Sequence, residues 1–464
     1  MINKRKTNII NLKGEVNMNK NFCDKNSFKI SFLYILLFCL IVSSFVGCSN
    51  DTSQNNDNSK VCSEVKISNQ AQGLEVENFL KNNHATINLK DNNDVSSFSL
   101  LNSSLEGYTV FLTGEAHGVA ANTDVQIKLL KYLNEKAGVK YFLIERGYSD
   151  SVILNRYLKT GDENILKQYY EGINGTLNYT INDYEMWKKL YEYNKKKSIE
   201  DKIKVIGIDV EYTPLSAFKC MYSLIPHEEA PSEIKPTIEK FKALNDGKIS
   251  LKTQEIEPYF FTINEDINKN RSIYEKYFKG NLFDFEFISN NIYNFFNSTR
   301  VDFEKLRDQC IYENFLKIYT TLPKGKFFGE FGLDHISHKK YGEFGVDKFN
   351  MLLRNESNSP VKSSVVSIPY IYKGCKTMFD TKEGYNTNVY NTFDMNNKVL
   401  EPFLESDFTL FRLDGQDSPF QKKLIWLLSN GGYAGDLDDQ KEVTTDYYQY
   451  CIVIQNSEAA KPFK

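Results

Sequence analysis

Short apolar runs alternate with longer amphipathic segments in the first half of the chain, and this alternation restricts the possible folds more than any other feature. The apolar runs, each as long as a strand, are 108–112, 139–144 and 203–208. The segments that fit helices are 122–136, 149–158 and 182–197. Strands that alternate with helices favour a parallel sheet with helices on its faces. We therefore expect an α/β protein with a mainly parallel central sheet and flanking helices.

The rest of the chain predicts further elements of both kinds. Residues 214–322 are rich in helix formers and aromatic residues, which predicts a helical insertion that forms a cap beside the sheet. Further strands are predicted at 326–330, 363–370, 408–413 and 447–454. Because proline cannot donate a hydrogen bond to a neighbouring strand, the strand with Pro369 is expected to end there or to lie at an edge.

Charge and cysteine content exclude several classes of protein. The 464 residues include 57 Lys and Arg against 60 Asp and Glu, a formal net charge of −3. This balance argues against a strongly basic nucleic-acid-binding protein, so no nucleic-acid partner is expected. Eight cysteines in this length, with no CxxC motif, indicate neither a disulfide scaffold nor a cysteine-based zinc site.

The N-terminal 47 residues have the pattern of a secretory signal. Lysines precede an apolar run at 30–46, and Gly47, Cys48 and a polar stretch follow it. The sequence Phe45-Val46-Gly47-Cys48 resembles a bacterial lipobox, whose cysteine becomes the lipidated first residue of the mature protein. An uncleaved transmembrane helix is the alternative, because about 17 apolar residues is the short end of a span. Translation from Met18 rather than Met1 would also keep the pattern.

The lipobox interpretation sets the expected organisation and location. It predicts a signal peptide at 1–47, lipid such as palmitate on Cys48, a flexible polar tether at 48–60 and one α/β domain at 61–464. The protein would then be anchored to the extracytoplasmic face of the cell membrane, with the lipid bilayer as one partner.

Polar residues follow directly after four of the predicted strands. They are Glu115 and His117, Glu145 and Arg146, Asp209 and Glu211, and Asp334, His335 and His338. The carboxyl ends of parallel strands lie along one edge of a sheet, where open α/β folds bind ligands. We therefore expect carboxylates and imidazoles from distant parts of the chain to meet in one cleft.

The residue types suit acid–base chemistry. His117 lies between Gly114 and Gly118, which permit a tight turn, and a neutral imidazole is a suitable general base for water. Glu115 or Glu145 could orient the ring. Histidines 335 and 338 are three residues apart and are expected to share one face of a helix.

Each of these residues also has a purely structural interpretation. The histidines can be hydrogen-bonded residues at strand ends, and Glu145-Arg146 can be an ion pair at the edge of the sheet. Asp209 can cap the helix that follows it. Arg307-Asp308 lies in a helical pattern and can be an ordinary solvated pair.

Five segments in a fixed order resemble the erythromycin esterase-like family. They are GEAHG, FLIERGYSD, GIDVEY, RDQCIYENF and FGLDHISH, within a similarity that spans roughly 75–455. The family belongs to a wider group with ChaN-type haem-binding lipoproteins and TraB/Tiki-type proteins. The resemblance implies catalytic roles for His117 as general base and for Glu115, Glu145, Arg307 and His335. It implies substrate-binding roles for Asp209, Asp308 and His338.

Three functions remain open from the sequence. A hydrolase would use His117 to activate water against an ester or lactone of a small-molecule substrate, and no GxSxG motif indicates a serine nucleophile. A metal-dependent hydrolase or peptidase would use Glu115, His117, Glu145 and His335 as ligands, although no HExxH motif occurs. A surface lipoprotein would bind haem or another small ligand. No cofactor is expected for the first of these functions, and a divalent metal is left open.

Overall fold

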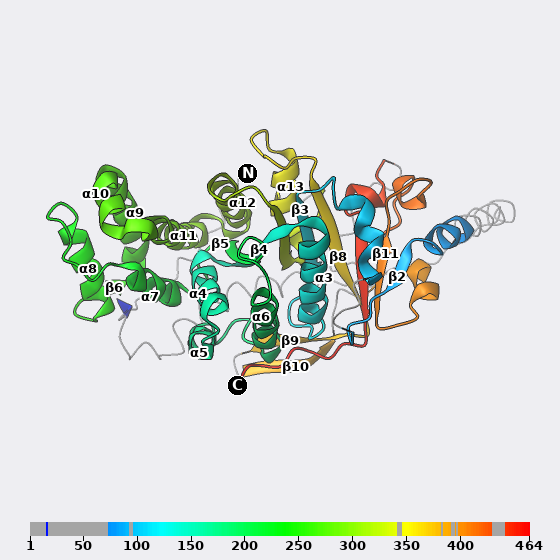
Figure 1. Cartoon of the computed structure of the whole chain (residues 1–464), viewed down its shortest axis with the longest axis horizontal. Coiled ribbons are helices and arrows are strands. Elements are labelled where there is room, and N and C mark those ends of the chain that lie inside the picture. The colour runs from blue at the N-terminus through cyan, green and yellow to red at the C-terminus, as the bar shows by residue number, and fades with distance from the viewer. Residues whose placement is uncertain are drawn as a thin grey trace, which may run out of the picture.

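The computed structural model describes residues 15–16, 73–91, 96–340, 346–381, 384–390, 395, 398–428 and 441–464. Its centre is a sheet with the strand order β2-β11-β12-β8-β3-β7-β4-β5 (Figure 1). In chain order these strands are β2 (His84–Thr86), β3 (Val110–Glu115), β4 (Val139–Gly147), β5 (Lys204–Asp209), β7 (Lys326–Gly332), β8 (Val365–Lys373), β11 (Phe408–Arg412) and β12 (Tyr450–Gln455). The strands from β12 to β5 are parallel. Strand β11 pairs antiparallel with β12 on one side and with β2 on the other, so β11 alone runs against the other strands of this sheet. The predicted α/β class with a mainly parallel sheet is confirmed.

Helices cover both faces of the sheet. Those before β5 are α3 (Asn122–Ala137), α4 (Tyr148–Thr160), α5 (Glu163–Gly172) and α6 (Ile181–Asn194). Those between β5 and β7 are α7 (Pro214–Leu224), α8 (Lys235–Asn245), α9 (Thr253–Lys269), α10 (Arg271–Phe278), α11 (Leu282–Val301) and α12 (Phe303–Thr321). Helix α13 (Phe349–Asn355) follows β7. In Figure 1, α8, α9 and α10 lie beyond the β5 end of the sheet, and β2 lies at the opposite end.

Alternate residues of the central strands pack into two hydrophobic cores, one on each face of the sheet. Val110 and Leu112 of β3 pack into the core that contains α7 to α12. Phe111, between them, packs into the core that contains α3, α5 and α6. Because both faces are covered, the central parallel strands are continuous apolar runs, and this is why they could be recognised in the sequence.

Two smaller sheets complete the fold. Strands β9 (Lys376–Thr381) and β10 (Gly384–Tyr390) form an antiparallel pair, and β1 (Glu15–Val16) pairs with β6 (Leu251–Lys252). Within the described ranges, no helix is both long enough and apolar enough to cross a membrane. The apolar run at 30–46, Cys48 and the predicted tether lie outside the described residues.

The prediction that Pro369 marks an edge strand or a strand end is wrong. Strand β8 continues to Lys373 and lies inside the sheet, between β12 and β3. Its residues up to Pro369 pair with β3, whereas its residues from Tyr370 onward pair with β12. Proline is tolerated because it lies where the strand passes from one partner to the other, so its missing N–H interrupts neither pairing.

Candidate functional site

The sheet order brings four carboxyl ends together. Strands β3, β7, β4 and β5 are consecutive neighbours, and Glu115 at the end of β3 is level with Gly332 at the end of β7. Glu145 and Asp209 are near the ends of β4 and β5. Residues that are more than two hundred positions apart in the chain, such as Glu115 and Gly332, therefore share one edge.

His117 is the solvent-accessible member of the site. Its side chain is 40% exposed, and Nδ1 lies 2.9 Å from Oε1 of Glu115. Its other ring nitrogen, Nε2, lies 3.9 Å from Oε2 of Glu145. Partial burial disfavours the charged ring, but the hydrogen bond to Glu115 and the charges of Glu145 and Glu115 outweigh it and raise the pKa of His117. The imidazole is thus oriented from one side and open to solvent.

The backbone around His117 is held by two distant segments. The carbonyl of Gly118 accepts hydrogen bonds from the N–H groups of Met378 and Ala460, at 2.9 and 2.7 Å. The hydroxyl of Thr377 donates to the carbonyl of His117. Gly118 has a φ of +84°, and a Cβ there would lie 2.4 Å from the Met378 carbonyl oxygen. Only glycine fits this turn, which fixes the position of the adjacent imidazole.

Glu145 is the centre of the charged cluster. Its Oε2 accepts a hydrogen bond of 2.5 Å from the N–H of Gly332, and its Oε1 accepts one from Nη2 of Arg307. Oε1 also lies 3.4 Å from Nε2 of His335. Burial alone would raise the pKa of this carboxyl, but the charges of His335 and Arg307 hold it well below its usual range. Glu145 is therefore an anion that faces two histidines.

Arg307, on α12, joins Glu145 to Asp209. Its Nε lies 3.2 Å from both carboxylate oxygens of Asp209, and its Nη2 lies 2.6 Å from Oδ2. The guanidinium also stacks over the rings of Tyr212 and Phe303, at 5.1 and 6.0 Å from their centroids. These contacts bury most of Arg307, whose side chain is 16% exposed. The alternative of an ordinary solvated Arg307-Asp308 pair does not hold.

His335 lies behind Glu145 with both ring nitrogens engaged. Nδ1 is 2.6 Å from Oδ1 of Asp308, and Nε2 is 3.1 Å from Nη1 of Arg307 as well as close to Glu145. The arginine contact favours a neutral ring, whereas the two carboxylates favour a charged one. Burial also favours the neutral ring, yet the charges of Asp308 and Glu145 outweigh it and raise the pKa of His335 to about 10. We assign the charged form, because two carboxylates flank the ring.

Asp308 and Asp209 hold other side chains rather than face solvent. Asp308 is 1% exposed and also accepts a hydrogen bond of 2.8 Å from the N–H of Phe349. Asp209 is fully buried, and its Oδ1 also accepts from the N–H of Val210. Helix α7 begins only at Pro214, so the alternative that Asp209 caps the following helix is wrong. These carboxylates contact Arg307 and His335, and their contact with a substrate stays a prediction.

His338 lies outside the cluster. The short helix after β7 covers only Leu333–His335, so the prediction that the two histidines share a helical face is wrong. Nε2 of His338 lies 2.8 Å from Oε1 of Gln449 instead. Burial lowers the pKa of His338 to about 3, so this ring is neutral, and its predicted role in substrate binding stays a prediction.

Glu145 and Arg146 have separate partners on opposite faces of β4. Nη2 of Arg146 lies 2.7 Å from Oδ1 of Asp183 on α6, and its Nη1 donates to the hydroxyl of Tyr169. The suggested ion pair between the two consecutive residues is therefore absent from the contacts of these described side chains. Consecutive strand residues point to opposite faces, which explains the separation.

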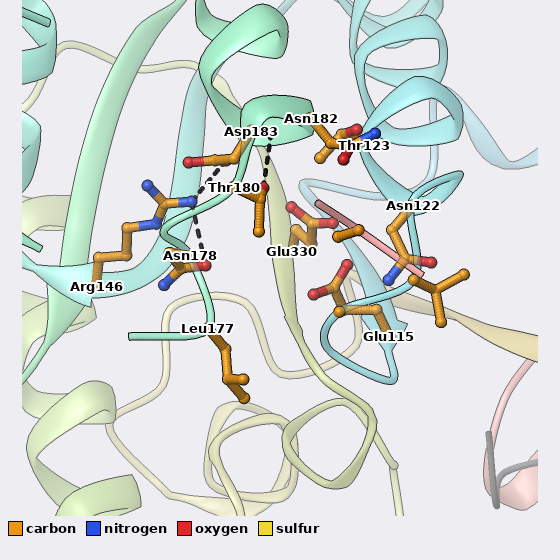
Figure 2. Close-up of a pocket in the computed structure, with 13 residues that line it drawn as sticks. Glu115, Asn122, Thr123, Arg146, Leu177, Asn178, Thr180, Asn182, Asp183 and Glu330 are labelled. Atoms are coloured by element: carbon orange, nitrogen blue, oxygen red, sulfur yellow. Dashed lines mark hydrogen bonds and ion pairs between the residues drawn. The ribbon is translucent and has the colours of Figure 1, made fainter. Parts of the chain in front are cut away.

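Two residues near the site were given no role from the sequence. Glu330 is two positions before the end of β7 and lines a polar cavity with Glu115, Arg146 and Asp183 (Figure 2). Tyr212, which stacks on Arg307, follows β5 by three residues. The alternation of β7 could have identified Glu330, because a charged residue inside an apolar parallel strand is unusual.

The candidate metal ligands do not form a ligand cluster. In the described part of the chain, no group of three or more His, Cys, Asp or Glu side chains is arranged to hold a metal ion. Instead, the ligand atoms of Glu145 and His335 are taken up by each other, by Arg307 and by Asp308. The geometry fits a hydrogen-bonded charge network better than a metal centre.

This is an α/β protein with an exposed imidazole and buried charged side chains at the carboxyl edge of its sheet. Several solved structures share this fold. A Bacillus cereus protein matches with a TM-score of 0.61 and 17% identity, over 84% of this chain and 99% of that one. A mutant of the erythromycin esterase EreC, in its open conformation, matches with a TM-score of 0.60 and 14% identity, over 81% and 98%. Such low identities show the fold alone.

Other comparisons add little. A haem complex of ChaN from Campylobacter jejuni matches at 15% identity, over 63% of this chain and 92% of that one, but with a TM-score of only 0.30. No protein-family model matches the chain. No curated protein matches it in sequence either.

Proposed function

We propose that the protein is a hydrolase that cleaves an ester or lactone in a small molecule, with His117 as the general base. One observation carries the proposal: His117 is 40% exposed at the carboxyl edge, and its Nδ1 is held 2.9 Å from Glu115. A donor to a carboxylate at Nδ1 places the free lone pair of the neutral ring on Nε2. The fold that the chain shares with an erythromycin esterase supports this reaction class.

In the proposed reaction, His117 first accepts a proton from water and then donates it to the leaving group. Nε2 of His117 takes a proton from water while the water oxygen forms a bond to the carbonyl carbon. The bond from that carbon to the alcohol oxygen then breaks, and the proton passes from Nε2 to the departing alkoxide. Glu115 holds the ring, and Glu145 stabilises its charged form from 3.9 Å.

Arg307 is the best-placed group to stabilise the developing oxyanion. A guanidinium has five N–H donors. Those of Nε and Nη2 are directed at Asp209 and Glu145, and Nη1 contacts His335. One N–H of Nη1 is left over from the contacts to described residues, and the buried carboxylates keep the guanidinium rigid. A fixed donor of this kind stabilises negative charge without reorganisation.

The test is hydrolysis of a panel of carboxylic esters and lactones by the purified protein. The variant His117→Ala should lower kcat/KM by about 10²- to 10⁴-fold, because it removes the general base. Its melting temperature should stay close to that of the wild type, since the side chain is partly exposed. His227→Ala, which changes an exposed histidine between α7 and α8, is the matched control and should keep full activity. Undiminished turnover by His117→Ala would reject the proposed role.

Membrane anchoring through Cys48 is a second part of the proposal, and the lipobox-like Phe45-Val46-Gly47-Cys48 supports it. Cells that express the protein should incorporate radiolabelled palmitate into it, and Cys48→Ala should abolish the label. Cys310→Ala, at a partly exposed cysteine in α12, should keep the label. Equal labelling of both variants would contradict anchoring at Cys48.

A further inference from the structure

A polar cavity lies on the α6 face of the sheet, on the other side of β3 and β7 from Arg307. Figure 2 shows Glu115 and Glu330 directed into it from the sheet, with Asn122 on α3 and Asp183 on α6 around them. Its volume is about 40 Å³, room for a few water molecules. The cavity matters because one of its residues, Glu115, also holds the proposed base.

Glu330 is a partly buried acid without a cation of its own. It pairs in register with Thr113 of β3, so its side chain lies on the same face as Glu115, two residues further along. Oε1 of Glu330 is buried and has no hydrogen-bond partner among the described residues. The nearby Arg146 is committed to Asp183 at 2.7 Å. An ionised carboxylate at this position would therefore be poorly compensated.

The uncompensated position favours a protonated Glu330. Burial raises its pKa well above the usual range, and the charge of Glu115, which accepts a hydrogen bond from it, raises the pKa further. The other charged or titratable groups that face Glu330 are Asp183, Arg146 and Tyr370. A protonated Glu330 would be the donor, and Glu115 the acceptor, of the hydrogen bond between them.

Glu115 then has two donors, one in the cavity and one at the carboxyl edge. In the cavity it accepts a hydrogen bond from the protonated Glu330, and at the carboxyl edge its Oε1 lies 2.9 Å from Nδ1 of His117. A donor to a carboxylate spreads and lowers its negative charge, so Glu115 attracts the charged form of His117 less strongly. Glu145 and Arg307, which also face His117, are not touched by this contact.

We propose that Glu330 is a positioning residue that acts through Glu115 to set the basicity of His117. The purpose of this tuning rests on the proposed function: a base works best when its proton affinity matches the working pH. With the donor in place, more of His117 is in the neutral form that can accept a proton from water. Without this donor, Glu115 binds the charged ring more strongly, so less of His117 is neutral at pH 7 and able to accept a proton.

The test measures the His117 ring itself and so does not depend on activity. With only five histidines in the chain, NMR of ¹³C-labelled imidazoles can resolve His117, which is assigned by the signal lost in His117→Ala. Glu330→Met, which removes the donor at similar size, should raise the pKa of His117 by about 0.5 to 1 pH unit. Glu330→Gln, which keeps an N–H donor, should leave it within about 0.2 pH unit.

Two results would overturn the inference. Equal pKa values for His117 in the wild type and Glu330→Met would show that Glu330 only fills space. Equal shifts in Glu330→Met and Glu330→Gln would show that the hydrogen bond to Glu115 is not the cause.

A second measurement on the wild type covers the case that Glu330→Met does not fold. The carboxyl ¹³C signal of Glu330, assigned by its loss in Glu330→Gln, should keep the shift of a protonated acid at pH 7. An ionised signal would also reject the inference. An inactive wild type, or an active His117→Ala, would reject the proposed hydrolase while leaving these pKa results valid.

Discussion

Glu145 and Arg146 are consecutive on β4, yet they belong to two charge networks of different balance. On the α6 face, Arg146 has a single carboxylate partner, Asp183, at 2.7 Å. On the α12 face, Arg307 contacts two carboxylates, Glu145 and Asp209. Arg146 and Asp183 thus form a matched pair on the α6 face, whereas the α12 network has more anions than permanent cations.

The surplus of negative charge on the α12 face explains the state of the histidines. Asp308 adds a further buried carboxylate there, and among the described residues the permanent cation paired with it is Lys348, at 3.5 Å. Protonation of His335 and His117 therefore compensates the remaining charge, which agrees with the raised pKa of both rings. A matched ion pair needs no proton to balance its charge and mainly holds the structure. A network with surplus carboxylates instead favours histidines that bind a proton.

The largest expected effect comes from removing each arginine in turn. Arg307→Met and Arg146→Met should each lower the free energy of unfolding by about 3–5 kcal/mol, because each leaves buried carboxylates unpaired. Only Arg307→Met should also lower the kcat/KM of the protein that remains folded, by about tenfold or more, since Arg307 borders the exposed base. Urea denaturation and esterase assays on both variants test this contrast.

Lysine variants are the control for the case that the methionine variants do not fold. Arg307→Lys and Arg146→Lys keep the charge but lose the planar fork that binds two groups at once. Arg146→Lys should be nearly as active as the wild type, whereas Arg307→Lys should not. Equal losses of activity on the two faces would contradict the distinction between them.

Much of this fold follows from local sequence patterns, and the deviations have physical causes. Central parallel strands are continuous apolar runs because both faces are covered, so β3, β4 and β5 were predicted. The β9–β10 pair was not predicted, because β10 lies against solvent with no apolar run. Pro369 was misplaced because the change of partner along β8 depends on distant strands.

In the site, too, the features that depend on local sequence were predicted, and those that depend on distant packing were not. Glu115, Glu145 and Asp209 were predicted at one edge because strand order in an α/β sheet brings such ends together. His338 was predicted with them because spacing suggested a helix, but the chain leaves helical geometry after His335. The depth at which Arg307 and Asp308 are buried depends on how α12 packs against β5, which their own sequence does not encode.

The most gradual expected effect is a pH dependence of stability that arises from His335 on the α12 face. The pKa of His335 is about 10 in the folded protein, against about 6.5 in an unfolded chain. The folded state therefore binds the extra proton between these values, so the stabilisation is fully present below about pH 6.5 and is lost as the pH rises toward 10. The slope cannot exceed about 1.4 kcal/mol per pH unit for one group.

The measurement compares the free energy of unfolding of the wild type and His335→Gln by urea denaturation from pH 6 to pH 10. The difference between them should shrink as the pH rises, while His227→Gln should follow the wild type throughout. A difference that does not change with pH would mean that His335 is neutral and that its Nε2 accepts a hydrogen bond from Nη1 of Arg307, 3.1 Å away. In that case the α12 face would keep its negative surplus, and the contrast with the α6 face would rest on Arg307 alone.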